Sequence, residues 1–395
     1  MPFRPRRPSP LLGPYRPCFA SGLQLVCLAA GIALGLPGFA AADVVASKSQ
    51  IDPSAPPQLQ AKGSGDLDGD GKPDLVVGSK AGGIYWYRNG SWTPKRTISS
   101  GLKPAEEIRV ADLTGDGKPD VLVAAASGGT EWFENGGGGN SWTQRRIPSD
   151  KFHDIAVADI DGDGKADVIG RPLYTNRASK VLSIWRQVSK TSFVLTKINL
   201  PEFGSGLAVA KIDGDAKLDI AVGKYWLKNQ STPGAIKFRT YTYFSSAEQD
   251  ARVAAGDING DGRIDLFVTP PHGTIAGSHK VAWYEAPKDR TATWDEHVLE
   301  TGAAPNTHTA LILDVDNDGR KDLVTAVDSV EPGQRPIKIF INKGNETFTV
   351  QTIANDPQHS MQALTVAGGK KALAGADYNE QPKSSIDLWT LTPAP

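Results

Sequence analysis

Cysteine is nearly absent from this chain of 395 residues. Its only two cysteines, Cys18 and Cys27, both lie in the first 42 residues. If that segment is removed, the remaining chain contains no thiol and cannot form a disulfide. An exported protein without disulfides needs another way to hold its loops, and bound metal is the obvious candidate.

The chain also lacks an excess of either charge and a recognisable catalytic signature. It has 43 basic and 44 acidic side chains, and no basic block follows the N-terminal segment, so nucleic acid is not an expected partner. No nucleophile elbow, phosphate-binding loop, HExxH pair or dinucleotide fingerprint is present. No long apolar run follows residue 42, so no membrane span is expected in the mature chain.

The first 42 residues have the composition of an export signal. Four arginines and no acid precede an apolar run from Gly22 to Leu36, and the small residues Ala40 to Ala42 follow. This order predicts a secretory signal peptide over residues 1–42, with a retained N-terminal anchor as the alternative. Cleavage after Ala42 would remove four positive charges from a net charge of −1, which leaves about −5. We therefore expect residues 43–395 to be secreted, in a periplasm or outside the cell.

An acidic stretch of nine residues recurs six times in the rest of the chain. The copies begin at residues 66, 112, 159, 211, 257 and 314, at intervals of roughly 46 to 57 residues. Five copies keep acids at positions 1, 5 and 9 and glycine at position 6. The fourth copy has Lys211 at position 1 and Ala216 at position 6. The intervals have the length of a propeller blade.

Two further sequence features recur in the same order after each acidic stretch. An aromatic strand such as Ile84–Tyr87 follows each acidic stretch, and an outer strand such as Trp92–Ile98 comes next, which makes four short strands per unit. Residues 361–391 supply only three strands of a seventh unit, and Val44–Ile51 has the spacing of the missing outer strand. We predict an all-β, seven-bladed β-propeller over residues 43–395, closed by this N-terminal strand.

The spacing of the acids suits calcium, which takes six to eight oxygen ligands at about 2.3–2.6 Å. A solvated Asp-Gly turn is the alternative for one copy, but five copies in phase favour structural calcium at about five sites. The fourth copy is expected to bind none, because Lys211 places a positive charge at position 1. The predicted ligands, with a backbone carbonyl at position 7, are Asp66, Asp68, Asp70, Lys72 and Asp74; Asp112, Thr114, Asp116, Lys118 and Asp120; Asp159, Asp161, Asp163, Lys165 and Asp167; Asp257, Asn259, Asp261, Arg263 and Asp265; and Asp314, Asp316, Asp318, Arg320 and Asp322.

These stretches and the WYRN, WFEN and WYEAP strands resemble the FG-GAP/VCBS repeat family, which includes the integrin α-subunit propeller. The resemblance covers roughly residues 60 to 350 and implies a propeller with calcium in its blades. It does not imply one activity, since members include adhesion modules, lectin-like proteins, and the propeller domains of polysaccharide lyases and sugar dehydratases.

The six histidines are the main candidates for a second site. In the predicted topology, the loops before the inner strands share one face with the loops between second and third strands. Five of the histidines are expected on that face, and Tyr225 and Trp226 fall in another predicted loop there unless they belong to the blade core. The candidate catalytic residues, or ligands of an additional transition metal, are His153, His308, His272, Tyr174 and Arg171. The alternative is that these side chains only cap backbone groups.

Two classes of function follow from the sequence. The first is a secreted, monomeric, calcium-stabilised module that binds a glycan or an extracellular protein on its loop-rich face, or a cell-surface scaffold in the protein case. The second is an enzyme of the lyase or dehydratase type that acts on a sugar or polysaccharide. The absence of a catalytic motif favours the first, and the clustering of histidines supports the second.

Overall fold

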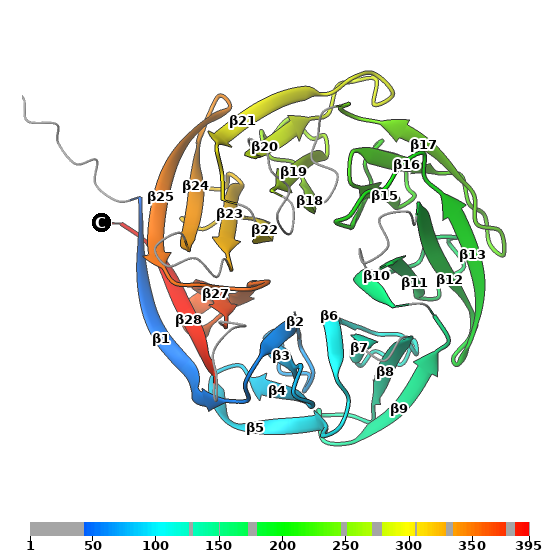
Figure 1. Ribbon diagram of the computed structural model, residues 1–395, viewed down its shortest axis with the longest axis vertical. Coiled ribbons are helices and arrows are strands. Elements are labelled where there is room, and N and C mark those ends of the chain that lie inside the picture. Colours follow the sequence, from blue (N-terminus) through cyan, green and yellow to red (C-terminus); the bar gives the residue numbers. More distant parts are fainter. Residues whose placement is uncertain are drawn as a thin grey trace, which may run out of the picture. The chain divides into compact units, whose positions relative to one another are not determined.

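Each interval of the repeat forms one antiparallel sheet of four strands in the computed structural model, and the sheets stand in a ring as seven blades (Figure 1). This confirms the predicted all-β, seven-bladed propeller. The structure describes residues 43–125, 129–149, 151–172, 180–245, 251–270, 279–304, 306–328, 335–376 and 384–394.

In the first six blades the strands follow one another along the chain, from the central channel outward. Blade one contains β2 (Leu59–Gly65), β3 (Asp74–Ser79), β4 (Ile84–Arg88) and β5 (Ser91–Ser99); blade two contains β6 (Pro104–Ala111), β7 (Asp120–Ala125), β8 (Thr130–Asn135) and β9 (Trp142–Ile147). Blade three contains β10 (Phe152–Ala158), β11 (Asp167–Pro172), β12 (Val181–Ser189) and β13 (Ser192–Asn199); blade four contains β14 (Ala208–Ala210), β15 (Asp219–Val222), β16 (Tyr225–Asn229) and β17 (Phe238–Thr242). Blade five contains β18 (Arg252–Gly256), β19 (Asp265–Thr269), β20 (Lys280–Glu285) and β21 (Asp295–Thr301); blade six contains β22 (Thr307–Leu313), β23 (Asp322–Val327), β24 (Pro336–Gly344) and β25 (Thr347–Asn355).

The seventh blade joins the two ends of the chain. Its strands are β26 (Gln362–Thr365), β27 (Lys371–Gly375), β28 (Ser384–Pro393) and, on the outside, β1 (Val44–Ala55). A short 3₁₀ turn, Ala367–Gly369, connects β26 to β27 where other blades have an acidic loop. Because β1 pairs antiparallel with β28, from Val44 opposite Pro393 onward, the ring is closed as predicted and β28 has no open edge.

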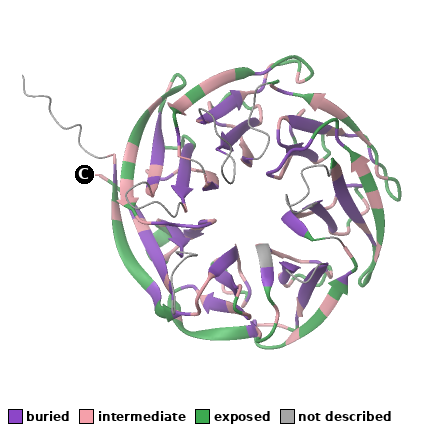
Figure 2. Ribbon diagram, in the orientation of Figure 1, coloured by how far each residue is buried: buried purple, intermediate pink, exposed green. Residues whose placement is uncertain are grey.

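The hydrophobic core is divided into layers between neighbouring blades. Among the described residues there are seven apolar clusters, and each combines side chains of two adjacent blades. Trp86 of blade one, for example, packs with Phe133 of blade two, and Trp226 of blade four packs with Tyr284 of blade five. Figure 2 shows the result: the inner strands are mostly buried, whereas the outer strands are largely exposed. A blade is therefore stable only beside its neighbours.

The outer strand of blade five begins directly after Trp294, whose indole is buried and donates to the carbonyl of Arg290 at 3.1 Å. Of the two interpretations of Tyr225 and Trp226, the blade core is confirmed: both are buried in β16 and do not lie in a surface loop. The reason is that only two residues separate β15 from β16, which leaves no loop for the two aromatic residues.

The chain separates into two units, Met1–Ala40 and Ala41–Pro395, and the described residues all belong to the second. The predicted signal peptide, residues 1–42, lies outside the described residues and stays a prediction. Within the described part of the chain, no helix has the length and apolar character needed to cross a membrane.

Candidate functional site

Six acidic loops join the first and second strands of blades one to six. They are residues 66–74, 112–120, 159–167, 211–219, 257–265 and 314–322. The β-ladder closes each loop, because the residue before position 1 pairs with the aspartate at position 9, as Gly65 does with Asp74. In an antiparallel meander these loops lie at one end of the blades, and the loops that precede the inner strands lie at the other end.

The aspartate at position 9 ties each acidic loop to the third strand of its blade. Asp74 accepts the backbone N–H of Leu67 at 3.0 Å and that of Asn89 at 2.8 Å. The fourth loop keeps two such bonds, from Asp213 and Asn229 to Asp219, although the loop donor is at position 3 rather than position 2 and positions 1 and 6 are changed. All six of these side chains are 0 % exposed: Asp74, Asp120, Asp167, Asp219, Asp265 and Asp322. They therefore have a structural role that does not require a metal.

Burial raises the pKa of these six carboxyl groups above the ordinary value of 3.8. The pKa is about 6 for five of them and about 7 for Asp265. At each carboxylate the two N–H donors oppose this shift, and neighbouring loop acids add to it. The pKa values of the position 9 aspartates thus lie only slightly below, or close to, neutral pH.

The residue that donates its N–H to the position 9 aspartate also fastens the blade to the preceding one. Asn135 is 1 % exposed, and its Nδ2 donates to the carbonyl of Leu67 in blade one at 2.8 Å and to that of Pro119 at 3.1 Å. Equivalent amide contacts to the preceding blade are made by Asn89, Gln187, Asn229 and Asn342. Blade five has Ala286 at this place, and Arg290 donates to Ile212 of blade four instead. We call these contacts the amide latches.

The aspartate at position 1 shapes the turn of each complete loop. Its Oδ2 accepts the N–H of the glycine at position 6 at 2.7–3.0 Å in all five complete loops. Gly71, the first of these glycines, has φ +83°, a conformation that side chains rarely adopt. The fourth loop has Lys211 and Ala216 at these two positions and lacks both features.

Cations of the chain offset part of the repulsion among the loop acids. The side chain at position 7 contacts the carboxylate at position 5 in each complete loop, at 3.0 Å for Lys118 and Asp116 and at 2.8 Å for Lys165 and Asp163. The hydrogen bond from Lys118 lowers the pKa of Asp116. In the fourth loop, Lys228 contacts Asp213. The loop acids are therefore held close together by compensating charges.

Three acidic loops bring three carboxylate oxygens within 4.8 Å of one another. These groups are Asp66, Asp68 and Asp70; Asp159, Asp161 and Asp167; and Asp314, Asp316 and Asp322. The second and fifth loops have Thr114 and Asn259 at position 3, so a neutral oxygen replaces one carboxylate there. An all-oxygen donor set of this kind fits a hard cation such as calcium better than zinc or copper.

The opposite end of the ring, which we call the channel face, carries a connected group of ionisable side chains. This channel cluster consists of His153, Asp154, Arg252, His308, Asp328 and His359. Asp154 lies at its centre, 3.0 Å from Nδ1 of His153 and 2.5 Å from a guanidinium nitrogen of Arg252. Burial alone would raise the pKa of Asp154, but the positive charges of His153 and Arg252 outweigh it and hold that pKa below its ordinary value.

The second half of the channel cluster brings two imidazoles together. The rings of His308 and His359 stack with their centroids 4.5 Å apart. His308 Nε2 lies 3.8 Å from Asp328, and His359 Nε2 lies 3.6 Å from the other oxygen of the same carboxylate. Arg252 Nη2, at 3.5 Å from His308 Nδ1, connects the two halves.

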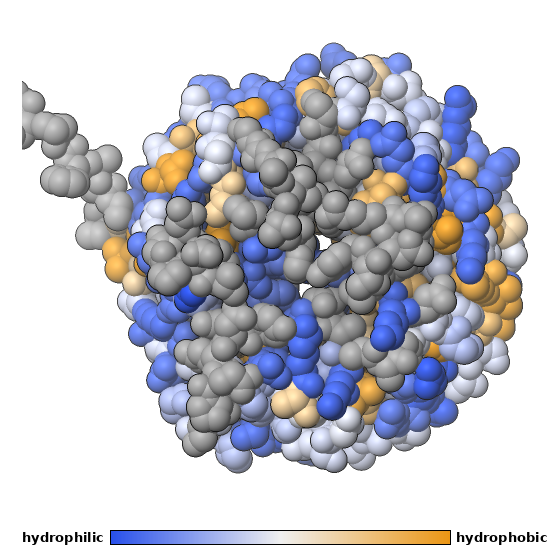
Figure 3. All heavy atoms as spheres, viewed as in Figure 1, coloured by the Kyte–Doolittle hydropathy of each residue, from blue (hydrophilic) through white to orange (hydrophobic). Residues whose placement is uncertain are grey.

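A polar cavity of about 170 Å³ lies in the central channel beside this cluster. Blades two to seven each contribute to its wall, through Glu107, Asp154, Leu207, Arg252, His308 and Gln362 among others. Arg109, which pairs with Glu107, also lines it. Figure 3 shows hydrophilic residues beside the central opening on the face it presents.

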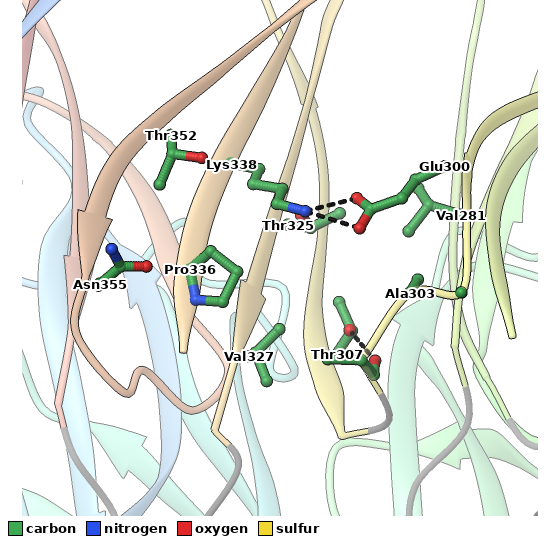
Figure 4. A pocket seen from close by; sticks show the side chains of 12 residues that line it. Val281, Glu300, Ala303, Thr307, Thr325, Val327, Pro336, Lys338, Thr352 and Asn355 are labelled. Atoms are coloured by element: carbon green, nitrogen blue, oxygen red, sulfur yellow. Dashed lines mark hydrogen bonds and ion pairs between the residues drawn. The ribbon is translucent and has the colours of Figure 1, made fainter. Parts of the chain in front are cut away.

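A larger cavity of about 470 Å³ lies between blades five and six (Figure 4). Lys338 and Glu300 point toward each other across it, with Nζ 2.6 Å from the carboxylate, and Val281, Val327 and Pro336 supply apolar wall. In this larger cavity Lys338 and Glu300 neutralise each other. The channel cavity is lined by a wider range of polar groups, so it is the better candidate for a ligand site.

Of the five predicted catalytic residues, two lie at the channel, one lies inside a blade, and two lie outside the described residues. His153 and His308 lie in the innermost strands β10 and β22 and face neighbouring cavities of the channel. Arg171 is 0 % exposed in β11, where it donates to the carbonyl of Gly204 and packs over the ring of Phe203, so it lines neither channel cavity. His272 and Tyr174 lie outside the described residues.

Sequence reasoning overlooked Asp154, Asp328 and the amide latches. Asp154 follows His153 directly, and Asp328 follows the buried strand β23, but neither recurs with the repeat. The latch residues do recur, 15 residues after position 9 in Asn89 and Asn135, so the repeat phase could have revealed them.

Replacing a latch side chain should loosen the contact between two blades. We expect Asn135→Ala to lower the free energy of unfolding by about 2–4 kcal/mol, because buried carbonyls of Leu67 and Pro119 lose their donor. The exposed Asn140→Ala, five residues away, should stay within about 0.5 kcal/mol of the parent. Urea unfolding in calcium measures both, and equal effects would contradict the assignment.

The raised pKa values predict how stability depends on pH without metal. The folded state binds protons more tightly than the unfolded chain at the six position 9 aspartates, so their contribution is complete below about pH 4 and is lost as the pH rises through 6 to 7. In chelator, the melting temperature should therefore be lower at about pH 7.5 than at about pH 5.5. A melting temperature that rises over this interval would show that the carboxylates are not destabilised by burial.

Comparison with known sequences identifies the repeat. Residues 66–123 and 112–170 match the FG-GAP-like repeat. No curated protein matches this chain significantly. The matched residues contain the first three acidic loops and the strands β3 to β10.

Comparison with solved structures agrees on the fold. Two crystal structures of BBS1N in complex with ARL6DN, one soaked with mercury and one with lead, align with TM-score 0.54 and 11 % identity, over 88 % of this chain and 96 % of that chain. At this identity the likeness shows the fold alone. The chain is thus a seven-bladed β-propeller in which residues 66–123 and 112–170 match the FG-GAP-like repeat and six acidic loops lie in phase.

Proposed function

We propose that residues 43–395 act as an exported, monomeric, calcium-stabilised propeller that binds a glycan or an extracellular protein at the channel face. The observation that carries the binding proposal is the polar channel cavity, where Arg109 and Arg252 meet carboxylates and histidines from several blades. Export rests on the order of basic, apolar and small residues in positions 1–42.

Calcium in the acidic loops is supported by the donor chemistry and by repetition. Five loops offer the same oxygen pattern, and three of them already gather carboxylate oxygens within 4.8 Å. When bound, calcium would neutralise the clustered acids and leave the position 7 side chains free to turn outward. The β-ladder and the position 9 aspartates would hold the ligands in place.

The channel cavity favours an acidic sugar as the ligand. Its volume of about 170 Å³ is below the roughly 300–1,000 Å³ of sites that enclose a drug-sized ligand, so it suits one unit of a longer chain. Guanidinium groups bind carboxylates through paired hydrogen bonds, and Arg109 has a partly exposed side chain that can reach such a group.

Two other functions have specific support. The fold alone is compatible with a protein ligand, since the similar propeller BBS1N is crystallised in complex with ARL6DN. A sugar-directed enzyme of the lyase or dehydratase type is supported by the paired imidazoles of His308 and His359 on the channel face. We prefer the binding module because the charged side chains of the channel cluster pair with one another, as Asp154 does with His153 and Arg252.

Calcium binding can be tested with two matched substitutions at position 5 of a loop. Asp163→Ala removes a predicted ligand in the third loop, whereas Asp215→Ala changes the fourth loop, which has Lys211 at position 1. Calcium at a hundredfold excess over Kd stabilises the native state by about 2.7 kcal/mol per site. Asp163→Ala should therefore lose about 2–3 kcal/mol of calcium-dependent stability, and Asp215→Ala almost none.

The same measurement includes its own control. Thermal melts of the parent and both variants are recorded with calcium and with chelator. If chelator leaves the parent's melting temperature unchanged, or if the two variants lose equal calcium-dependent stability, the proposal of calcium in the loops is wrong.

Ligand binding at the channel can be tested by screening immobilised glycans with the calcium-loaded protein. Uronate-bearing glycans should bind, and Arg109→Gln should weaken that binding at least about tenfold, the effect of losing one charge-assisted hydrogen bond. Arg96→Gln, an exposed position on β5, serves as the control and should bind like the parent. Binding that Arg109→Gln leaves unchanged would place the ligand elsewhere.

A further inference from the structure

Three side chains of the channel cluster converge in the manner of metal ligands. His308 Nε2 and His359 Nε2 lie 3.8 Å and 3.6 Å from the two oxygens of Asp328, and one ligand atom from each residue falls within 4.8 Å of the others. Ligand atoms that share one zinc ion at about 2.0–2.2 Å are roughly 3–3.5 Å apart. The two imidazole–carboxylate distances exceed this spacing by less than about 1 Å, and no ligand atom is more than 4.8 Å from the others, so side-chain movements of about 1 Å would bring all three onto one ion.

The backbone already orients one imidazole for this role. His359 Nδ1 lies 3.1 Å from the carbonyl of Gln60, which can only accept, so Nδ1 carries the proton and Nε2 presents its lone pair toward Asp328. Metal-binding histidines characteristically make this second hydrogen bond. The ammonium of Lys62 donates to the carbonyls of His359 at 2.6 Å and Gln60 at 3.4 Å, which holds the backbone on both sides of this contact in place.

Strand pairing fixes the positions of the three residues. His308 lies in β22, and Asp328 follows β23 in the same blade, where its N–H donates to the carbonyl of Asn306 at 3.1 Å. His359 precedes β26 of blade seven, and its N–H donates to the carbonyl of Ala376 at 3.3 Å. His308 is 5 % exposed and His359 is 1 % exposed. A rigid, shielded site of this kind loses little freedom when it binds an ion.

We propose that His308, Asp328 and His359 bind a divalent transition metal at the junction of blades six and seven. Two imidazoles and one carboxylate suit zinc, iron, cobalt or manganese, in contrast to the all-oxygen acidic loops. Three protein ligands leave a coordination position for an exogenous group. His308 and Arg252 both line the channel cavity, so a carboxylate could bind the metal and the guanidinium together. The site does not depend on which glycan or protein the propeller binds.

A second group on the outside of the ring provides a matched comparison. Glu285, His297 and Glu346 also place three ligand atoms within 4.8 Å, but they include one histidine only. That ring stacks on Trp283 with centroids 4.0 Å apart, and the side chain of Glu346 is 46 % exposed. This outer group is expected to bind the metal weakly by comparison.

The test is a zinc titration of the purified protein after chelator treatment, in excess calcium that saturates the acidic loops. Cobalt, which reports its ligands through visible absorption, serves as a second probe. The protein should bind one zinc ion per chain. His359→Gln and Asp328→Asn should each weaken zinc binding at least about a hundredfold, whereas His297→Gln should leave it unchanged.

Each remaining outcome overturns the proposal. No zinc or cobalt bound by the calcium-saturated protein would do so, as would equal affinity in the parent, His359→Gln and Asp328→Asn. Loss of binding in His297→Gln alone would assign the metal to the outer group. Thermal melts in calcium establish that each variant is folded, and Asp328→Asn, which keeps the size of the side chain, decides the matter if His359→Gln does not fold.

Discussion

A buried carboxylate with two backbone N–H partners is the interaction on which the rest of this structure depends. It recurs at position 9 of six acidic loops, and in each of these six blades it joins the loop to the end of the third strand. The residue that supplies the second N–H then reaches the preceding blade through its side chain in five blades. One repeated aspartate thus links loop geometry, blade geometry and the contact between blades. The fourth loop keeps it after losing positions 1 and 6, which separates this structural role from metal binding.

The two ends of the ring differ in chemistry because they are built from different connections. The loops between first and second strands are short, repeated and rich in carboxylates, a donor set for hard cations. The channel face is formed by the starts of inner strands, where the repeat imposes no residue type. Imidazole, guanidinium and carboxylate groups meet there, and among the described residues one cluster, His308, Asp328 and His359, combines two imidazoles with a carboxylate. A rigid propeller can therefore carry repeated loops at one end and non-repeated side chains at the other.

The sequence predicted what repeats and could not predict what occurs once. The interval of the acidic stretch, the aromatic strands and the position of Val44–Ile51 were enough for seven blades closed by an N-terminal strand. For Tyr225 and Trp226 the sequence left a loop and the blade core open, and the connection of only two residues between β15 and β16 leaves them in the core. The contact of Asp154 with Arg252 joins residues 98 positions apart. Such a pairing depends on which blades become neighbours across the channel, and no local pattern encodes it.

We propose that the acidic loops are calcium sites whose ligands the β-ladder holds in place. Calcium stoichiometry tests it most directly: the purified protein is stripped with chelator, dialysed against calcium and assayed for bound metal. The account predicts about five calcium ions per chain, one for each complete loop and none for the loop that contains Lys211. A stoichiometry of zero or one would contradict it and would leave the loop acids with the structural role of the position 9 aspartates alone.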